Sequence, residues 1–364
     1  VFGAIGLRNM GASNFQSFLK NQNVECGAIC DIDDSIISQR GADIEKIHAE
    51  KMANGERITH AKPIVYKDYR KLLENKDIDA VIISTPDHWH CLQMVHASEA
   101  GKHTYVEKPM ANSIAEVIVM ERAAKRYKKV VSIGQWQRSG KHWNDAVAYL
   151  RSGALGKISR VKAWSYTSKT ALPVVPDSPV PAGVDYDLWL GPAPKRPFNQ
   201  NRFHYNFRYF WDYAGGLMAD WGVHMLDYAL QGMNVGVPKS VMAMGGNFAN
   251  VDARETPDTL NVIYEYDDFS MIWEHSVCLG NGTNGMGHGI IFQGNNGMLL
   301  LSRGGWQVVP EKEIRDNQRV DKIELIPWTK GEGSLDEHAT NFIEVIRKGG
   351  QTNCTVEMGK KVEW

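Results

Sequence analysis

The chain has 364 residues, which is longer than a chain with one hydrophobic core usually is. Of these residues 43% are apolar, which is enough to fill the cores of two domains. Its 41 basic and 42 acidic residues leave a formal net charge of -1, which argues against general electrostatic binding of nucleic acid or of an anionic membrane. No run of about 18 apolar residues is present, so no membrane-spanning helix is expected. A small, neutral or weakly charged partner fits this composition better.

Short apolar runs alternate with helical patterns over the first part of the chain, which is typical of βαβ units that form a parallel sheet. Ser113 and Glu116 stand at capping-box spacing at the start of one helix, and Gly101 is placed to end the helix before it. These patterns predict an α/β Rossmann domain over residues 1–140. Its strands are expected at residues 2–6, 24–30, 64–66, 80–84, 103–107 and 130–134.

The string Gly6-Leu7-Arg8-Asn9-Met10-Gly11 joins the first strand to a helix, where a dinucleotide-binding turn belongs. Gly6 can make the tight turn, Gly11 allows the helix and strand to pack closely, and backbone N–H groups at the helix start can bind phosphate. Arg8 stands where the usual fingerprint has its second glycine. Its side chain could reach the phosphates or turn away from them.

Asp31 follows the strand at residues 24–30 and lies about 20 residues beyond Gly11. An acidic side chain there can accept hydrogen bonds from the adenosine ribose hydroxyls, and it would repel a 2'-phosphate. The position therefore favours NAD over NADP as the cofactor. The alternative is that Asp31 is only a turn residue at the end of a strand.

The composition changes at the turn formed by residues 152–156. Residues 260–266 and 271–275 alternate apolar and polar side chains, as strands with one buried face do. Residues 336–348 are predicted to form a helix, and the last residues of the chain look extended. We therefore expect an α+β domain over residues 141–364, built on an open, mostly antiparallel β-sheet.

Four strings carry a family resemblance: STPDHWH at residues 84–90, AGKHTYVEKP at 100–109, DLWLGPAP at 187–194 and GGLMADWGVHMLD at 215–227. With the glycine turn, they resemble the glucose-fructose oxidoreductase, inositol dehydrogenase and rhizopine catabolism protein family, Gfo/Idh/MocA, over nearly the whole chain. The resemblance implies NAD(P)-dependent oxidation or reduction of a hydroxyl on a sugar, polyol or glycoside. It also implies a homo-oligomer, a dimer or tetramer, assembled through the second domain's sheet.

The resemblance carries three catalytic positions onto Lys108, Asp220 and His224. A histidine titrates near working pH and can take the hydroxyl proton, while a lysine ammonium at the end of a parallel strand can hydrogen-bond the reacting oxygen. Asp220 would tune or orient these two. Further positions that usually line the cofactor fall on Thr85, Pro86, His90, Glu107 and Lys108 itself.

On a helix, Asp220, His224 and Asp227 share one face. The alternative is a helix capped by Asp220 with a hydrogen-bonded core histidine at 224. The spacing of Asp220 and His224 also resembles a pair of metal ligands, but no third ligand at a matching spacing follows, so no metal is expected. The five scattered cysteines favour free thiols over a zinc site or a disulfide framework.

Residues 167–213 are rich in proline, asparagine, charged and aromatic residues, and we expect them to roof the active site. Hydrogen-bond donors beside flat apolar faces suit a sugar ring, although a packed aromatic interface is the alternative. His88 could stack on the nicotinamide or pack the helix crossover. The residues expected to contact substrate are Arg138, Arg202, His204, Tyr205, Arg208 and Trp211.

Three functions compete at this point. The first is an NAD(P)-dependent dehydrogenase acting on CH–OH groups. The second is a glycosidase that keeps NAD bound, oxidises the sugar transiently and cleaves the glycosidic bond by elimination, which needs a second base. The third is a non-enzymatic sensor of NAD(H) or a sugar; Lys108, Asp220 and His224 argue against it, and Arg8 argues mildly for it. The sequence leaves the compartment open, cytoplasmic or, if a leader was removed, periplasmic.

Overall fold

Six parallel strands form the sheet of the N-terminal domain, in the order β3-β2-β1-β4-β5-β6. The computed structural model describes residues 1–169, 171–249 and 251–363 of the chain. The strand order and the parallel pairing confirm the predicted Rossmann sheet. Its strands are β1 (Phe2–Ile5), β2 (Cys26–Cys30), β3 (Ile64–Tyr66), β4 (Ala80–Ile83), β5 (His103–Val106) and β6 (Val131–Ile133).

Helices connect these strands, and their ends follow the capping residues. Ser113 accepts a hydrogen bond from the backbone N–H of Glu116 at 3.3 Å, as the capping box predicts, and Gly101 follows a helix end with φ +79°. Asp33 and Asp68 cap two further helices. The helices are α1 (Met10–Leu19), α2 (Asp34–Ala53), α3 (Tyr69–Glu74), α4 (Asp87–Glu99) and α5 (Ile114–Tyr127).

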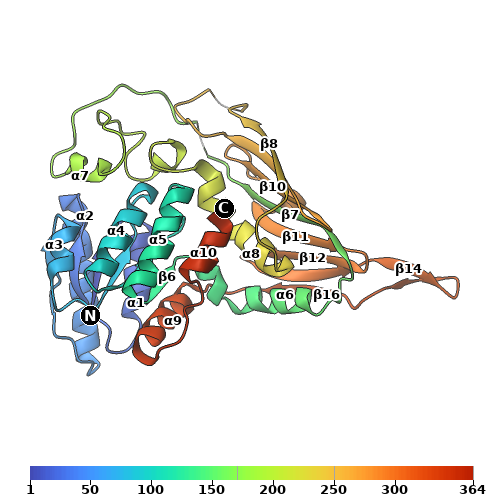
Figure 1. Ribbon diagram of the computed structural model, residues 1–364, viewed down its shortest axis with the longest axis horizontal. Coiled ribbons are helices and arrows are strands. Elements are labelled where there is room, and N and C mark those ends of the chain that lie inside the picture. The colour runs from blue at the N-terminus through green and yellow to red at the C-terminus, as the bar shows by residue number, and fades with distance from the viewer. Residues whose placement is uncertain (170, 250, 364) are drawn as a thin grey trace.

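The second domain is built on an eight-stranded sheet in the order β16-β13-β12-β11-β7-β10-β9-β8. Only the pair β7 and β10 is parallel, so the mostly antiparallel sheet is confirmed. The hairpin of β14 (Lys312–Arg315) and β15 (Gln318–Asp321) extends away from it (Figure 1). The eight strands are β7 (Ile158–Tyr166), β8 (Ser240–Gly246), β9 (Thr259–Glu265), β10 (Ser270–Ser276), β11 (His288–Gly294), β12 (Gly297–Ser302), β13 (Gly305–Pro310) and β16 (Ile326–Lys330).

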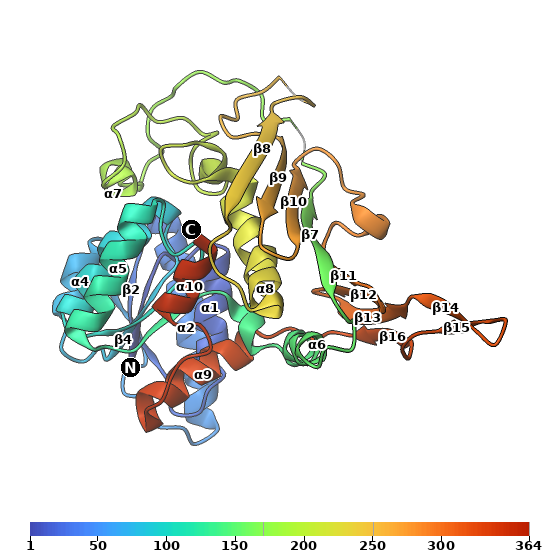
Figure 2. The same ribbon diagram turned by 45° about the vertical axis from the view of Figure 1, so that its right-hand side comes forward.

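Two helices, α6 (Lys141–Arg151) and α8 (Val223–Met233), cover the face of this sheet that is turned toward the Rossmann domain (Figure 2). Trp143 of α6 packs with Tyr228 of α8, with 4.5 Å between ring centroids, above the buried sheet residues Trp273 and Phe292. Large apolar side chains from both layers therefore fill a second core. None of the helices in the described ranges is long and apolar enough to cross a membrane.

The roof predicted over residues 167–213 lies above the carboxyl ends of the Rossmann strands and contains the short helix α7 (Tyr186–Leu190) (Figure 1). The indole N–H of Trp89 in α4 donates to the carbonyls of Leu188 and Trp189 at 3.1 and 3.0 Å. Gly191, at φ +50°, passes so close that a Cβ there would lie 2.0 Å from the Trp89 ring. The roof is thus fixed to the first domain by direct packing.

The last two helices, α9 (Leu335–Lys348) and α10 (Val356–Glu363), return to the first domain, although the division at residue 140 assigns them to the second (Figure 2). Phe342 of α9 packs against Phe18 of α1, with 5.8 Å between ring centroids. The prediction that the chain ends in an extended segment is wrong. The residues of α10 fold as a helix because Val356 and Gly359 are buried, with Gly359 close to the side chains of Met110 and Ile133.

Candidate active site

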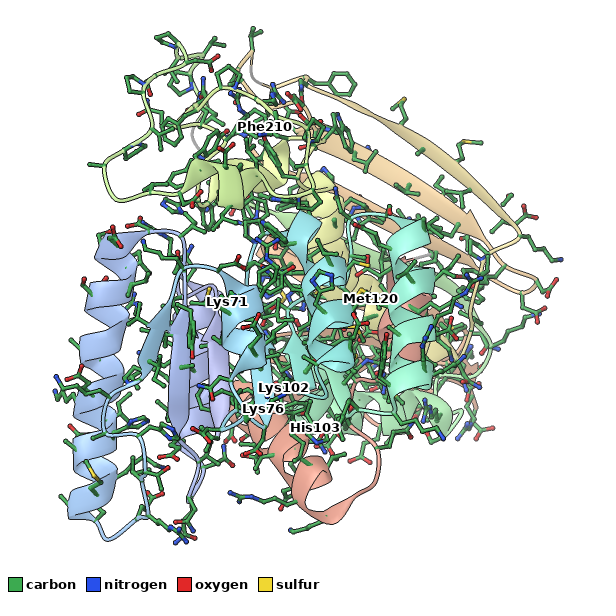
Figure 3. All side chains as sticks on the ribbon, turned by 60° about the vertical axis from the view of Figure 1, so that its left-hand side comes forward. Lys71, Lys76, Lys102, His103, Met120 and Phe210 are labelled. Carbon is green, nitrogen blue, oxygen red and sulfur yellow. The ribbon has the colours of Figure 1, made fainter. Side chains whose placement is uncertain are left out.

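A cavity of about 550 Å³ lies between the carboxyl ends of the Rossmann strands and the roof, a size typical of ligand sites. The glycine turn, the STPDHWH and EKP strings, the roof and the start of α8 all contribute to its wall. Figure 3 gives the orientation: Phe210 lies in the roof, whereas Lys102 and His103 lie at the opposite, amino end of the sheet. The cavity therefore occupies the edge where open α/β sheets bind ligands.

The glycine turn has the close backbone contacts that a dinucleotide site requires. Gly6 adopts φ +80°, and a Cβ there would lie 2.7 Å from the backbone of Ser84. A Cβ on Gly11 would lie 2.1 Å from the Gly6 carbonyl oxygen, so the helix packs on the turn as predicted. Asn9 makes no side-chain cap to α1, so no side chain blocks the start of this helix, although the Gly11 N–H already donates to the Arg8 carbonyl at 2.7 Å. The turn therefore fits a pyrophosphate.

Arg8 turns toward the acidic residues after β2. Its guanidinium donates to Asp33 at 2.5 Å, and His204 Nε2 of the roof lies 3.3 Å from the same carboxylate. Asp31 lines the cavity and accepts from the backbone N–H groups of Leu7 and Ile32, both at 2.8 Å. Burial raises the pKa of Asp31, and these donors oppose the shift. Asp33 was not predicted as a site residue, although its helix-capping position is visible in the sequence.

The EKP lysine and the first acid of the later motif form an ion pair inside the cavity. Lys108 Nζ lies 2.7 Å from Asp220 Oδ1 and donates to the Asp220 backbone carbonyl at 2.9 Å, with the side chains 11% and 17% exposed. Arg208 Nε lies 3.3 Å from the other carboxylate oxygen. Burial opposes ionisation of Asp220, but Arg208 and Lys108 outweigh it and hold its pKa well below the usual range.

His224 also lines this part of the cavity, between the rings of Trp136 and Trp221, whose centroids lie 6.0 and 6.2 Å away. Burial, followed by the charges of Lys108 and Arg303, lowers its pKa well below the ordinary value. The imidazole is therefore neutral at neutral pH and able to accept a proton. Its Nδ1 is buried and has no hydrogen-bond partner within the described part of the chain.

Asp220 and His224 do not lie on one regular α-helix. Residues Met218–Gly222 form a π-helical turn, and α8 begins at Val223. The wider turn carries Asp220 toward Lys108, whereas Asp227 lies outside the cavity and pairs with Arg138. Such π-helical turns occur frequently at functional sites.

Several predicted residues do reach the cavity. Thr85, Pro86, His90, Glu107, His204, Tyr205 and Arg208 all line it. The two ring nitrogens of His90 lie 2.7 Å from the Pro109 carbonyl oxygen and 2.8 Å from the Thr85 carbonyl oxygen, so this side chain joins the two cofactor strings. Glu107 is buried and accepts from Asn14 Nδ2 at 3.0 Å.

Five predicted residues lie outside the cavity wall: Gly11 packs against the Gly6 carbonyl, and other groups engage the side chains of the remaining four. His88 binds the Trp189 carbonyl at 3.0 Å and packs the roof. Arg138 forms a buried pair with Asp227, and Arg202 binds Asp177 and the Pro197 carbonyl. Trp211 is 56% exposed, and its indole donates to the Glu255 carbonyl. The placement of these four gives no support for direct contact with cofactor or substrate.

Four charged residues in the wall were not predicted: Lys67, Asp68, Asp87 and Arg303. Asp87 follows Pro86 at the start of α4, and burial raises its pKa to about 7 against the opposing charges of Arg208 and Lys108. Arg303 comes from the turn between β12 and β13, far along the chain from the other motifs. Asp87 lies within a recognised string and could have been found from it, whereas nothing in the local sequence marks Arg303.

Protein-family models match both of the domains that contribute residues to this site. A model described as the oxidoreductase family, NAD-binding Rossmann fold, matches residues 2–135, and one described as the oxidoreductase family, C-terminal alpha/beta domain, matches residues 134–277. The chain belongs to the Gfo/Idh/MocA oxidoreductase family. The glycine turn, Asp31 and Lys108 therefore belong to the family's NAD-binding domain, and Asp220 and His224 to its C-terminal domain.

Curated relatives match only part of the chain. Glycosyl hydrolase family 109 protein 1 of Shewanella sp. (strain MR-4) is 32% identical over 160 residues, which is 43% of this chain and 32% of that protein. An alpha-N-acetylgalactosaminidase of Shewanella oneidensis is 31% identical over the same length and coverage. The match thus spans about a third of these relatives.

Solved structures share the whole fold. The aldose-aldose oxidoreductase of Caulobacter crescentus superposes with a TM-score of 0.71 at 18% identity, over 100% of this chain and 93% of that one. The WlbA dehydrogenase of Bordetella pertussis, solved with NADH and UDP-GlcNAcA, gives 0.69 at 16% identity, over 100% and 92%. At this identity the likeness establishes the fold.

Proposed function

We propose that this protein is an NAD-dependent oxidoreductase that acts on a hydroxyl group of a sugar, polyol or glycoside. The observation that carries the proposal is the meeting of Lys108, Asp220 and His224 at one end of the cavity whose other end holds the glycine turn and Asp31. A proton acceptor and a cation are thus placed together beside a dinucleotide site. That is the set of groups that oxidation of an alcohol requires.

A bound NAD would supply the acceptor for the hydride that leaves the carbinol carbon. Neutral His224 takes the hydroxyl proton, so that the C–H and O–H bonds break and a carbonyl forms. Lys108 donates a hydrogen bond to the same oxygen and stabilises its developing negative charge. Asp220 holds the ammonium by two contacts, at 2.7 and 2.9 Å, and thereby positions it. In the reverse direction His224 returns the proton.

The first test is to denature freshly purified protein and analyse the released small molecules for nicotinamide dinucleotides. The second is to add NAD to emptied protein and follow NADH formation with a panel of sugars and polyols. NADH formation that depends on sugar supports the proposal. A protein that binds neither NAD nor NADP contradicts it at its first step.

A second function, glycoside cleavage with a retained NAD, is favoured by two observations. The matched relatives carry glycosidase names, and Asp87 places a group that titrates near neutral pH in the same wall as Lys108 and His224. An elimination mechanism needs such a second proton acceptor. Release of p-nitrophenol from p-nitrophenyl glycosides without net NADH formation would favour this function over simple dehydrogenation.

We also propose a homo-oligomer formed through the second domain's sheet. Strand β8 exposes Val241, Met242 and Met244 at 56%, 72% and 69%, and Ile263 of neighbouring β9 is 45% exposed. An apolar patch of this kind is typical of a protein interface. Light scattering of the purified protein measures its mass, and a Met242→Glu variant should shift the distribution toward monomer; a wild-type monomer would contradict the proposal.

A further inference from the structure

Arg303 lines the cavity and has no direct ion-pair partner among the residues that the structure describes, although the charge of Asp220 acts on it from farther away. Its guanidinium carbon lies 4.7 Å from the ring centroid of Trp136 and 4.4 Å from that of Trp221, the two rings that flank His224. These cation–π contacts fix the side chain without neutralising it. Within the described ranges, no carboxylate lies within ion-pair distance of Arg303.

The donors of Arg303 are also largely unused. Its Nε donates to the side-chain oxygen of Gln137 at 3.2 Å, and its terminal nitrogens make no hydrogen bond to any residue that the structure describes. A guanidinium has five N–H donors in a planar fork that matches a carboxylate or a phosphate. The guanidinium is therefore held through its Nε and through its two flat faces, and its terminal nitrogens can still donate to a ligand.

The charges around Arg303 add to the same effect. Lys108 and Arg208 line the same region and share one carboxylate, that of Asp220, so three cations face one permanently ionised acid. Asp87 is a second acid in the wall, and burial holds it mostly protonated below about pH 7. Glu107 is a third acid in the wall; burial raises its pKa, and it accepts hydrogen bonds from Asn14 and from the backbone N–H of Lys108. An anionic ligand would balance the excess positive charge.

We infer that the substrate carries an anionic group, a carboxylate or a phosphate on the sugar, and that Arg303 binds that group. This inference rests on the proposed function, because it assigns the substrate class of the same cavity. The composition of the chain predicted a small partner that is neutral or weakly charged, and this inference specifies a sugar that carries one acidic group. Trp136 and Trp221 contact both Arg303 and His224. A sugar whose anionic group binds Arg303 therefore has its ring beside His224.

Binding to the NAD-loaded protein tests the inference independently of turnover. Isothermal titration would compare D-glucose with D-glucuronate and D-glucose 6-phosphate, and D-galactose with D-galacturonate and D-galactose 6-phosphate. We expect at least one acidic sugar to bind about 10- to 100-fold more tightly than its neutral partner, the range of one charge-assisted contact. Comparing the uronates with the sugar phosphates shows which anion the protein prefers. Added salt should weaken the binding of the acidic sugars more than that of the neutral sugars.

Variants then assign the effect to Arg303. Arg303→Gln should reduce the affinity ratio of the acidic sugar to its neutral partner to within about threefold. Arg303→Lys keeps the charge but loses the planar guanidinium, so it should retain part of that ratio. Arg319→Gln, on the exposed β14–β15 hairpin, is the matched control and should keep the full preference. Thermal unfolding and NAD binding verify that each variant is folded.

The outcomes separate this inference from the proposed function. If no acidic sugar binds more tightly than its neutral partner, or if Arg303→Gln leaves the preference unchanged, the inference is wrong, while NADH formation from neutral sugars would still support the oxidoreductase. If acidic sugars bind through Arg303 but no sugar yields NADH, the inference holds and the proposed oxidation fails.

Discussion

Replacing Lys108 with alanine is the sharpest test of the reaction chemistry. In the structure the ammonium uses two of its three protons on Asp220, one on Oδ1 at 2.7 Å and one on the backbone carbonyl at 2.9 Å. The third proton is the one available to the reacting oxygen. Loss of a single fixed donor to a developing oxyanion costs about 2.7 to 4 kcal/mol, so kcat should fall by about 100- to 1,000-fold.

The fold should survive this change. Removing one partner of a buried ion pair costs about 3 to 5 kcal/mol when the remaining charge is left alone. Asp220 keeps Arg208 at 3.3 Å, and Arg303 also favours its ionised form, so the cost here should be smaller. NAD binding should remain within about threefold, because the glycine turn and Asp31 lie at the other end of the cavity.

The assay is steady-state NADH formation with the best substrate of the sugar panel, together with NAD binding by fluorescence and the urea midpoint of unfolding. Lys141→Ala is the matched control, since Lys141 is 87% exposed and forms an exposed pair with Asp145. A Lys108→Ala enzyme whose kcat stays within about threefold of wild type would remove this lysine from the chemistry. A large loss of NAD binding would instead assign it to the cofactor.

Three further predictions concern other parts of the cavity. Asp31→Ala should weaken NAD binding about 10-fold or more and NADP binding less, and unchanged NAD affinity would refute its contact with the ribose. Burial raises the pKa of Asp87 from 3.8 to about 7, so its contribution to stability is full below about pH 4 and is lost as the pH rises through 7. Asp87→Asn should therefore flatten the decline of the unfolding free energy between about pH 5 and about pH 8, which this group makes at most about 3 kcal/mol and which urea unfolding measures; an equally steep decline in the variant would count against this. Gly191→Ala should lower the free energy of unfolding by about 1 to 3 kcal/mol more than Gly55→Ala does. Both glycines have positive φ, but of these two only Gly191 would bring a Cβ against Trp89. Equal losses in thermal unfolding would show that backbone strain alone accounts for the effect.

The sequence predicted those parts of the fold and site that depend on local signals. Strand ends, helix caps and the EKP string are short-range patterns, so Lys108 could be placed at the carboxyl end of β5 without coordinates. Arg303 could not, because its position depends on how the β12–β13 turn of a distant sheet meets the Rossmann domain. Such long-range packing leaves no periodicity in the sequence around the residue.

Residue type alone also failed to separate arginines that line the cavity from arginines that lie outside it. Arg208 lies in the wall, whereas Arg202 is engaged by Asp177 and the Pro197 carbonyl. The C-terminal helix α10 was missed for a related reason. Its helical state depends on burial against Met110 and Ile133, and these contacts come from the other end of the chain.

Arg138 shows how a residue predicted to bind sugar can instead determine where the base lies. Its guanidinium donates to both carboxylate oxygens of Asp227, at 2.7 and 2.5 Å, with the two side chains 9% and 2% exposed. Arg138 follows β6 of the Rossmann sheet, and Asp227 lies in α8, one helical turn after His224. The pair therefore joins the domain that supplies Lys108 to the helix that supplies His224. Because the proposed base and the proposed oxygen-binding cation come from different domains, their distance depends on this buried contact.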